Sequence, residues 1–67
     1  MELIETPNPN AKKIITDLSE NEIPKTLSEV DGVDSIFFGP GFITITKNEN
    51  IDWESINQDI INIFDKL

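Results

Sequence analysis

The chain has 67 residues, with 13 acidic side chains against five lysines and a formal net charge of −8. It contains no cysteine and no histidine, which excludes disulfides, thiolate or imidazole metal sites, and nucleophilic catalysis of the Cys–His or Ser–His kind. The acidic balance disfavours partners that are themselves anionic, such as nucleic acids and membrane surfaces. The size predicts one domain, residues 1–67, and the lack of a signal-type or membrane-spanning apolar run predicts a cytoplasmic protein.

The first segment predicts a β-hairpin. Residues 2–6 and 11–16 contain apolar and β-branched residues typical of two short strands. Between them, Pro7 and Pro9 lack backbone donors and push the preceding residues toward extended geometry, while the asparagines tolerate turn conformations. We expect the two strands to pair antiparallel.

A helix of about ten residues is predicted next. Asn21 is a candidate N-cap, Pro24 falls in the first turn, and Gly32 suits the position just past the end. Ile23, Leu27 and Val30 recur at i, i+4 and i+7, which is the spacing of one apolar helix face.

The second half repeats this order. A strand opening at Val33 and a second one ending at Lys47 flank Gly39-Pro40-Gly41, a strong hairpin pattern. Asp52 then caps a final helix whose apolar face is formed by Trp53, Ile56, Ile60, Ile63 and Leu67. The element order ββαββα predicts an α+β two-layer sandwich, with a four-stranded, mainly antiparallel sheet and two helices on one face.

Three segments of the sequence resemble a known family. Residues 6–12, T-P-N-P-N-A-K, are similar to the signature near the start of the N-terminal domain of Nfu-type iron–sulphur scaffold proteins. Residues 32–47, G-V-D-S-I-F-F-G-P-G-F-I-T-I-T-K, and the pair Asp52-Trp53 resemble later parts of that domain. The connection between Ile15 and Asn21 is shorter than in longer family members.

The resemblance implies a role in the assembly or delivery of iron–sulphur clusters. In full-length members a second domain with a C-x-x-C motif binds the cluster, and the 67 residues contain no such motif. We therefore expect an accessory that binds no cofactor or metal and contacts other proteins, among them a C-x-x-C protein acting in trans.

Two groups of residues are candidates for partner contact. Strand alternation places Phe37 and Phe42 on the sheet face opposite the helices, where exposed paired aromatics are typical of a protein-binding surface. The alternative is that the two rings pack on each other and on the first hairpin. Asn8, Asn10 and Lys12 form the second group, in and beside a rigid polar loop; the plainer alternative is a turn that needs these residues for its conformation.

Three classes of function remain open at this point. The first is a non-enzymatic interaction module in iron–sulphur assembly. The second is a regulatory or homodimeric domain of the same fold, since fold does not determine function. An enzyme is the least favoured, because the chain lacks nucleophile–base combinations and its core is too small to enclose a sizeable pocket.

Overall fold

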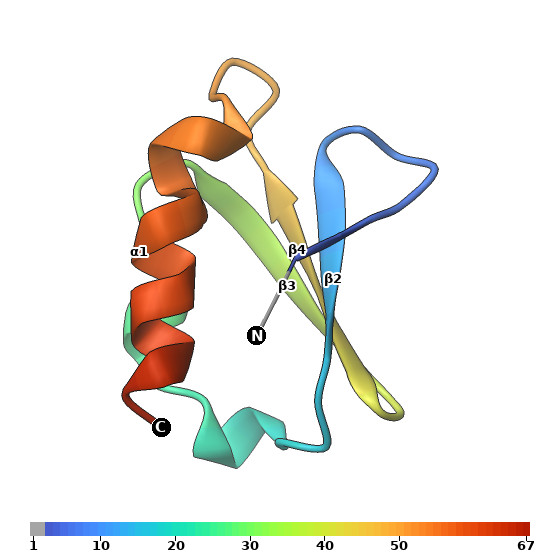
Figure 1. The fold of residues 1–67 in the computed structure, drawn as a ribbon, viewed down its shortest axis with the longest axis vertical. Helices are drawn as coiled ribbons and strands as arrows, with labels where there is room; N and C mark the ends of the chain where they lie inside the picture. The colour runs from blue at the N-terminus through green and yellow to red at the C-terminus, as the bar shows by residue number, and fades with distance from the viewer. Residues whose placement is uncertain (1–2) are drawn as a thin grey trace.

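The structure is a computed structural model that describes residues 3–67. It contains a four-stranded antiparallel sheet in the order β1-β2-β4-β3 and one α-helix. The elements are β1 (Ile4–Glu5), β2 (Ala11–Ile15), β3 (Val33–Gly39), β4 (Phe42–Lys47) and α1 (Trp53–Asp65), with two 3-10 turns, η1 (Glu20–Glu22) and η2 (Lys25–Leu27). Figure 1 shows α1 standing along one side of the sheet. The predicted α+β fold with an antiparallel sheet is confirmed.

The first predicted helix is replaced by η1 and η2. The reason is Pro24: the residue before a proline is disfavoured in helical geometry, and Ile23 accordingly takes the extended conformation, with φ −91° and ψ 128°. Pro24 is also extended, with ψ 145°. A continuous helix through this point is therefore broken into two single turns, and the sheet is covered by one α-helix rather than two.

The first hairpin forms as predicted, with shorter strands. Ile4 pairs with Lys13 and Glu5 pairs with Lys12, in antiparallel register. The predicted strand began at Glu2, which lies outside the described residues. β2 ends at Ile15, one residue earlier than expected.

The β3–β4 hairpin closes on the predicted Gly-Pro-Gly segment. Gly39 pairs with Phe42, so the connection is Pro40 and Gly41. Gly41 has φ 78°, a conformation that L side chains rarely adopt, and proline followed by such a glycine is the sequence of a type II turn. Near the start of β3 a register irregularity lies between Val33 and Ser35.

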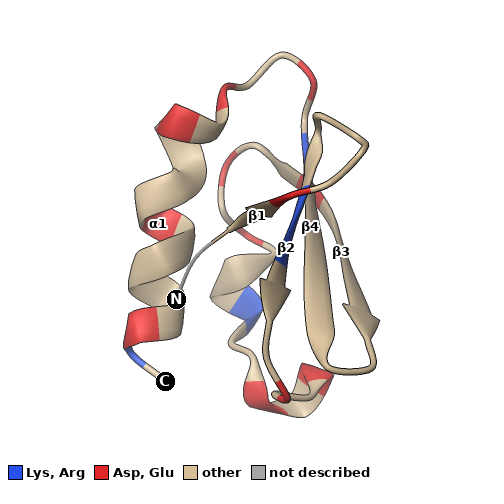
Figure 2. Cartoon of the chain, turned by 45° about the vertical axis from the view of Figure 1, so that its right-hand side comes forward, with Lys and Arg blue, Asp and Glu red and all other residues tan. Residues whose placement is uncertain are grey.

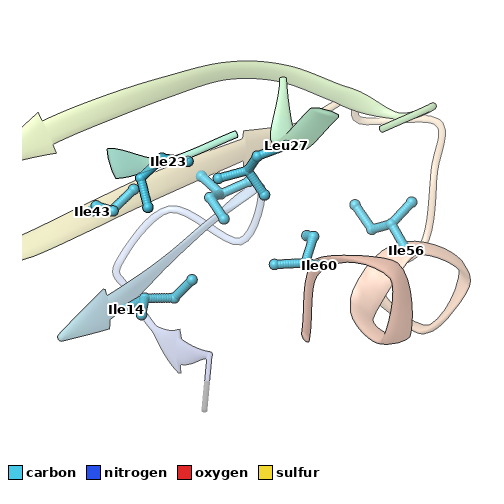
Figure 3. Packing of buried hydrophobic residues seen from close by; sticks show 7 residues of the cluster. Ile14, Ile23, Leu27, Ile43, Ile56 and Ile60 are labelled. Carbon is cyan, nitrogen blue, oxygen red and sulfur yellow. The ribbon is translucent and has the colours of Figure 1, made fainter. Parts of the chain in front are cut away.

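The hydrophobic core lies between one face of the sheet and the segments that cover it. Ile14, Ile43 and Ile45 come from the sheet, and Ile56 and Ile60 from α1. Ile23 and Leu27 come from residues 20–28, which contain η1 and η2 and which we call the 3-10 region. Figure 3 shows these side chains converging from three parts of the chain. The apolar spacing of Ile23 and Leu27 thus predicted burial correctly although the helix did not form.

The final helix begins where the sequence predicts. Asp52 occupies the N-cap position, but its side chain makes no capping hydrogen bond. Ile56 and Ile60 are buried, Trp53 and Ile63 are partly buried against the core, and Leu67 lies beyond the helix and is exposed.

Candidate functional site

Among the described residues, no helix packs on the sheet face that points away from α1, and we call it the open sheet face. Register and alternation place on it the residues Ile4, Ala11, Lys13, Ile15, Ser35, Phe37, Phe42, Thr44 and Thr46. None of the 13 acidic residues of the chain is in this set, and its one charged side chain is Lys13. Figure 2 shows the acidic residues mainly on α1 and the connecting segments, with β4 and most of β3 free of them.

Phe37 and Phe42 lie together on this face. Their ring centroids are 6.2 Å apart with an interplanar angle of 38°, within the range of an aromatic pair. Phe37 is 62% exposed, and Ile15, the direct cross-strand partner of Phe42, is 64% exposed. Three strands therefore contribute one apolar row, Ile15–Phe42–Phe37, which we call the aromatic patch.

Gly39 makes this arrangement possible. A Cβ atom built at Gly39 would lie 2.3 Å from Cζ of Phe42, so the Phe42 ring lies directly over the glycine backbone. The ring thereby extends over β3 and meets the Phe37 ring, which lies on the same face two residues before Gly39. Both rings pack on each other, as one alternative held, while Phe37 keeps most of its surface exposed.

The residues of the Pro-Asn-Pro-Asn loop form hydrogen bonds mainly with one another and with the residues next to the loop. Oδ1 of Asn8 accepts a hydrogen bond from the backbone N–H of Asn10 at 2.9 Å, and the Asn8 carbonyl accepts one from the N–H of Ala11 at 3.0 Å. Thr6 Oγ1 donates to the Ala11 carbonyl at 2.8 Å. These contacts give the loop a structural explanation, although Asn8 itself is exposed.

Two further hydrogen bonds join this loop to the start of α1 and to the end of β4. The indole Nε1 of Trp53 donates to the Pro9 carbonyl at 3.0 Å, and Nζ of Lys47 donates to Oδ1 of Asn10 at 3.1 Å. Nζ of Lys12 and Nζ of Lys47 lie 5.3 Å and 5.9 Å from the centroid of the Trp53 ring, within cation–π range. We call Pro9, Asn10, Lys12, Lys47 and Trp53 the Trp53 cluster.

Sequence reasoning did not single out Lys47. It is 8% exposed, and its Nζ also donates to the carbonyl of Asn48 at 3.3 Å. The signal available in the sequence was alternation, because Lys47 falls on the same face of β4 as Ile43 and Ile45. Trp53 was predicted to be a core residue; its partial burial agrees, but its hydrogen bond to the loop was not foreseen.

The predicted contact residues thus fall into two separate places. Asn8, Asn10 and Lys12 gather near Trp53, at the end of β4 that carries Lys47, whereas Phe37 and Phe42 lie at the turn end of the β3–β4 hairpin. Residues 3–67 contain no group of three or more His, Cys, Asp or Glu side chains placed to hold a metal ion. In the same range, no helix has the length and apolarity needed to cross a membrane.

Comparison with known proteins finds sequence relatives over most of the chain. A family model described as "Scaffold protein Nfu/NifU N terminal" matches residues 16–67. A human protein named "NFU1 iron-sulfur cluster scaffold homolog, mitochondrial" is 37% identical over 73 aligned residues, covering 84% of this chain and 29% of its own length. A NifU-like protein of Schizosaccharomyces pombe is 30% identical and matches 88% of this chain. The chain spans about 30% of the length of these two relatives.

Solved structures also match. The crystal structure of the protein SAV1430 from Staphylococcus aureus superimposes with a TM-score of 0.77 at 26% identity, covering 96% of this chain and 95% of the other. A solution structure from Staphylococcus epidermidis, of the protein SeR13, gives a TM-score of 0.64 at 28% identity. It covers 98% of this chain and 94% of the other. These two proteins are of similar size to this chain, unlike the curated relatives.

Proposed function

This chain belongs to the family of Nfu/NifU N-terminal domains, and from that premise we propose that it is a non-enzymatic protein-interaction module in iron–sulphur cluster assembly. Its relatives are named as iron–sulphur cluster scaffold proteins. The module binds no cluster itself, because cluster ligation requires thiolate or imidazole groups and the sequence has neither. It acts by bringing another protein into place, and one such partner is a protein that carries a C-x-x-C motif.

The observation that supports this proposal is the aromatic patch. Phe37 and Ile15 are two of the three large hydrophobic side chains that stand exposed among the described residues, and both lie beside Phe42 on a face without acidic residues. Aromatic side chains grouped on an exposed surface are the usual anchors of protein interfaces. A partner that covered this patch would remove apolar area from water. This burial stabilises a complex by about 25 cal/mol per Å², before the costs of association are subtracted.

The Trp53 cluster has a supporting part in this proposal. Lys12 of β2 and Asn8 of the adjoining loop add polar contacts, while Asn10 holds the loop in place through Lys47. The loop is fixed to α1 before a partner arrives, so little conformational entropy is lost there on binding. Residence in the cytoplasm remains part of the proposal; the names of the human relative and of several others place those proteins in mitochondria.

A binding experiment with purified components tests the proposal. The C-x-x-C scaffold protein of the source organism is titrated onto the wild-type chain and onto Phe37→Ser, with binding followed by calorimetry. We expect at least a tenfold weaker interaction for Phe37→Ser. Leu67→Ser is the matched control, because Leu67 is also a large exposed hydrophobic residue (52%) but lies outside the open sheet face.

Two outcomes contradict the proposal. One is that this chain binds no cluster scaffold and no cluster-containing client of the source organism at the protein concentrations used in the calorimetry. The other is a stoichiometric, protein-bound iron–sulphur chromophore after anaerobic reconstitution of this chain alone, which would make it a cluster carrier rather than an accessory.

A further inference from the structure

The outer edge of β3 is the longest unpaired strand edge among the described residues. β3 has seven residues and lies at one end of the sheet, with β4 on one side and no strand on the other. The opposite edge is β1, which has two residues. An edge strand of this length presents a row of backbone donors and acceptors to which another extended chain can add.

The register identifies which backbone groups point outward. The two-residue connection makes Gly39 and Phe42 a hydrogen-bonded pair, and this pattern alternates along an antiparallel ladder. The N–H and C=O groups of Ile36 and Phe38 therefore point away from β4. Outside the ladder, no hydrogen bond between described residues reaches the backbone of either residue.

A groove runs beside this free edge. It has a volume of about 500 Å³ and lies between the 3-10 region and β3. Its apolar lining comes from Ile23, Pro24, Ile36 and Phe38, and its polar lining from Glu20, Asn21, Lys25 and Ser28. Ile36 and Phe38 thus offer both free backbone groups and the wall of an apolar recess.

The charge around the groove selects the occupant. Residues 20–34, which run from the groove into the start of β3, contain five acidic residues and one lysine; of these, Glu20 and Lys25 line the groove itself. Asp34 is exposed at the register irregularity of the edge strand itself. Charged residues on an edge oppose pairing with a like-charged strand, so pairing between two copies of this chain is disfavoured; the irregularity lies before Ser35 and leaves the edge at Ile36 and Phe38 regular.

We propose that β3 receives an extended, basic segment of a partner protein as a fifth strand. Its backbone pairs with Ile36 and Phe38, one apolar side chain enters the groove, and lysine or arginine side chains meet Glu20 and Asp34. Alternate side chains of the added strand project onto the open sheet face beside Phe37. This inference rests on the proposed function as an interaction module and specifies how the partner backbone binds.

Selection from a displayed library of random heptapeptides tests this directly, without knowledge of the partner. We expect the enriched peptides to alternate lysine or arginine with Val, Ile or Phe, and to lack glutamate and aspartate. The charge-reversed variant Glu20→Lys/Asp34→Lys tests the role of the two carboxylates in binding. Both positions are exposed and lie away from the core, so we expect this variant to fold. The best synthetic peptide should bind this variant at least tenfold more weakly than the wild-type chain.

Amide hydrogen exchange then locates the bound peptide. Saturation with the peptide should slow exchange at Ile36 and Phe38 at least tenfold, and the same peptide methylated on all its central amide nitrogens should not bind. Each of the following results would overturn the inference: no basic preference in the selection, unchanged exchange at Ile36 and Phe38, or equal binding of the methylated peptide. Slower exchange at these amides with rising protein concentration alone would identify a second copy as the occupant and would also overturn it.

These outcomes are separable from those of the proposed function. Loss of scaffold binding in Phe37→Ser with no peptide selected at β3 would leave the aromatic patch as the interface and remove only the added strand. Peptide addition at β3 without any binding of cluster-assembly proteins would keep the added strand and remove the iron–sulphur role.

Discussion

Lys47 is a buried lysine without a carboxylate partner among the described residues. Its ammonium group donates to Oδ1 of Asn10 and to the carbonyl of Asn48, and it lies 5.9 Å from the Trp53 ring centroid. Removing an ammonium group from water costs free energy, which these contacts must offset. Its role is to tie the Pro-Asn-Pro-Asn loop to the end of β4.

We predict that Lys47→Met lowers the free energy of unfolding by about 1–2 kcal/mol, because two acceptors lose their charged donor. Methionine keeps the apolar stem of the side chain, so packing changes little. Urea denaturation measures the change. Lys13→Met is the matched control: the same substitution on the open sheet face should change stability by less than about 0.5 kcal/mol.

The pair Lys47 and Asn10 can be tested for coupling in the same assay. With Asn10→Ala and the double variant, a double-mutant cycle should give about 0.5–1.5 kcal/mol of interaction free energy. A coupling of zero would mean that the loop is held by the Trp53 hydrogen bond and by the backbone hydrogen bond from Lys47 N–H to the Asn10 carbonyl (2.8 Å), without help from the Lys47 ammonium group. A more stable Lys47→Met variant would mean that desolvation outweighs the contacts of the ammonium group.

In the β3–β4 hairpin the Phe42 ring lies over Gly39. We predict that Gly39→Ala displaces the ring, because the new Cβ would be 2.3 Å from Cζ of Phe42. The expected cost is about 1–3 kcal/mol, as for overpacking. The Phe37 ring resonances should shift at the same time, since the 6.2 Å ring pair is broken.

Phe42→Ala is the background in which this explanation can fail. In that background Gly39→Ala should cost less than about 0.5 kcal/mol, because the clashing ring is gone. Gly41→Ala serves as a contrast: a Cβ there has nothing within 4 Å, but φ is 78°, so its cost should be about 1–2 kcal/mol in either background. An equal cost of Gly39→Ala in both backgrounds would contradict the proposed clash.

The 3-10 region shows where reasoning from sequence fails for an element and why. The spacing of Ile23, Leu27 and Val30 predicted a helix, and a proline in the first turn is compatible with one. The restriction that Pro24 places on Ile23 is stronger than that spacing, and Ser28 Oγ donates locally to the Lys25 carbonyl at 2.8 Å. Strands and the final helix were predictable, because alternation, turn residues and apolar spacing all agreed there.

Leu27 should be the anchor of this region. It is fully buried in the core cluster, so Leu27→Ala is expected to cost about 2–5 kcal/mol. The whole domain should have a stability of only about 3–10 kcal/mol at this length, so the variant will be partly unfolded at moderate temperature. Thermal denaturation checks this against Thr26→Ala, an exposed neighbour that should lie within about 0.5 kcal/mol of wild type.

At the scale of the molecule, the sequence predicted which face of the sheet is open. It did not predict that the candidate contact residues lie in two separate places, the aromatic patch and the Trp53 cluster. Phe37 and Phe42 follow from alternation alone, because period-2 patterning assigns them to one face. The Trp53 cluster could not be predicted, since it joins residues 9, 10, 12, 47 and 53 through tertiary contacts. Long-range contacts of single polar side chains leave no periodic signal in a sequence.

The net charge of −8 should also act on the whole molecule. At about 10 mM salt the Debye length is about 30 Å, which matches the longest dimension of the fold, 29 Å, so carboxylates throughout the molecule repel one another. At about 150 mM salt it falls to about 8 Å. We predict that this change stabilises the fold by about 1 kcal/mol, which for a domain of this size raises Tm by about 4–8 °C.

A charge-reduced variant separates screening from other salt effects. Glu29→Gln/Glu49→Gln/Asp65→Asn removes three exposed carboxylates and brings the net charge from −8 to −5. Asp65 is also unfavourable at the C-terminal end of the helix dipole of α1, so the variant should be more stable than wild type at low salt and less responsive to added sodium chloride. A wild-type Tm that does not change with salt, or an equal response in the variant, would show that repulsion between the surface carboxylates does not lower the stability of the fold. In that case the acidity would matter for selecting basic partners and not for stability.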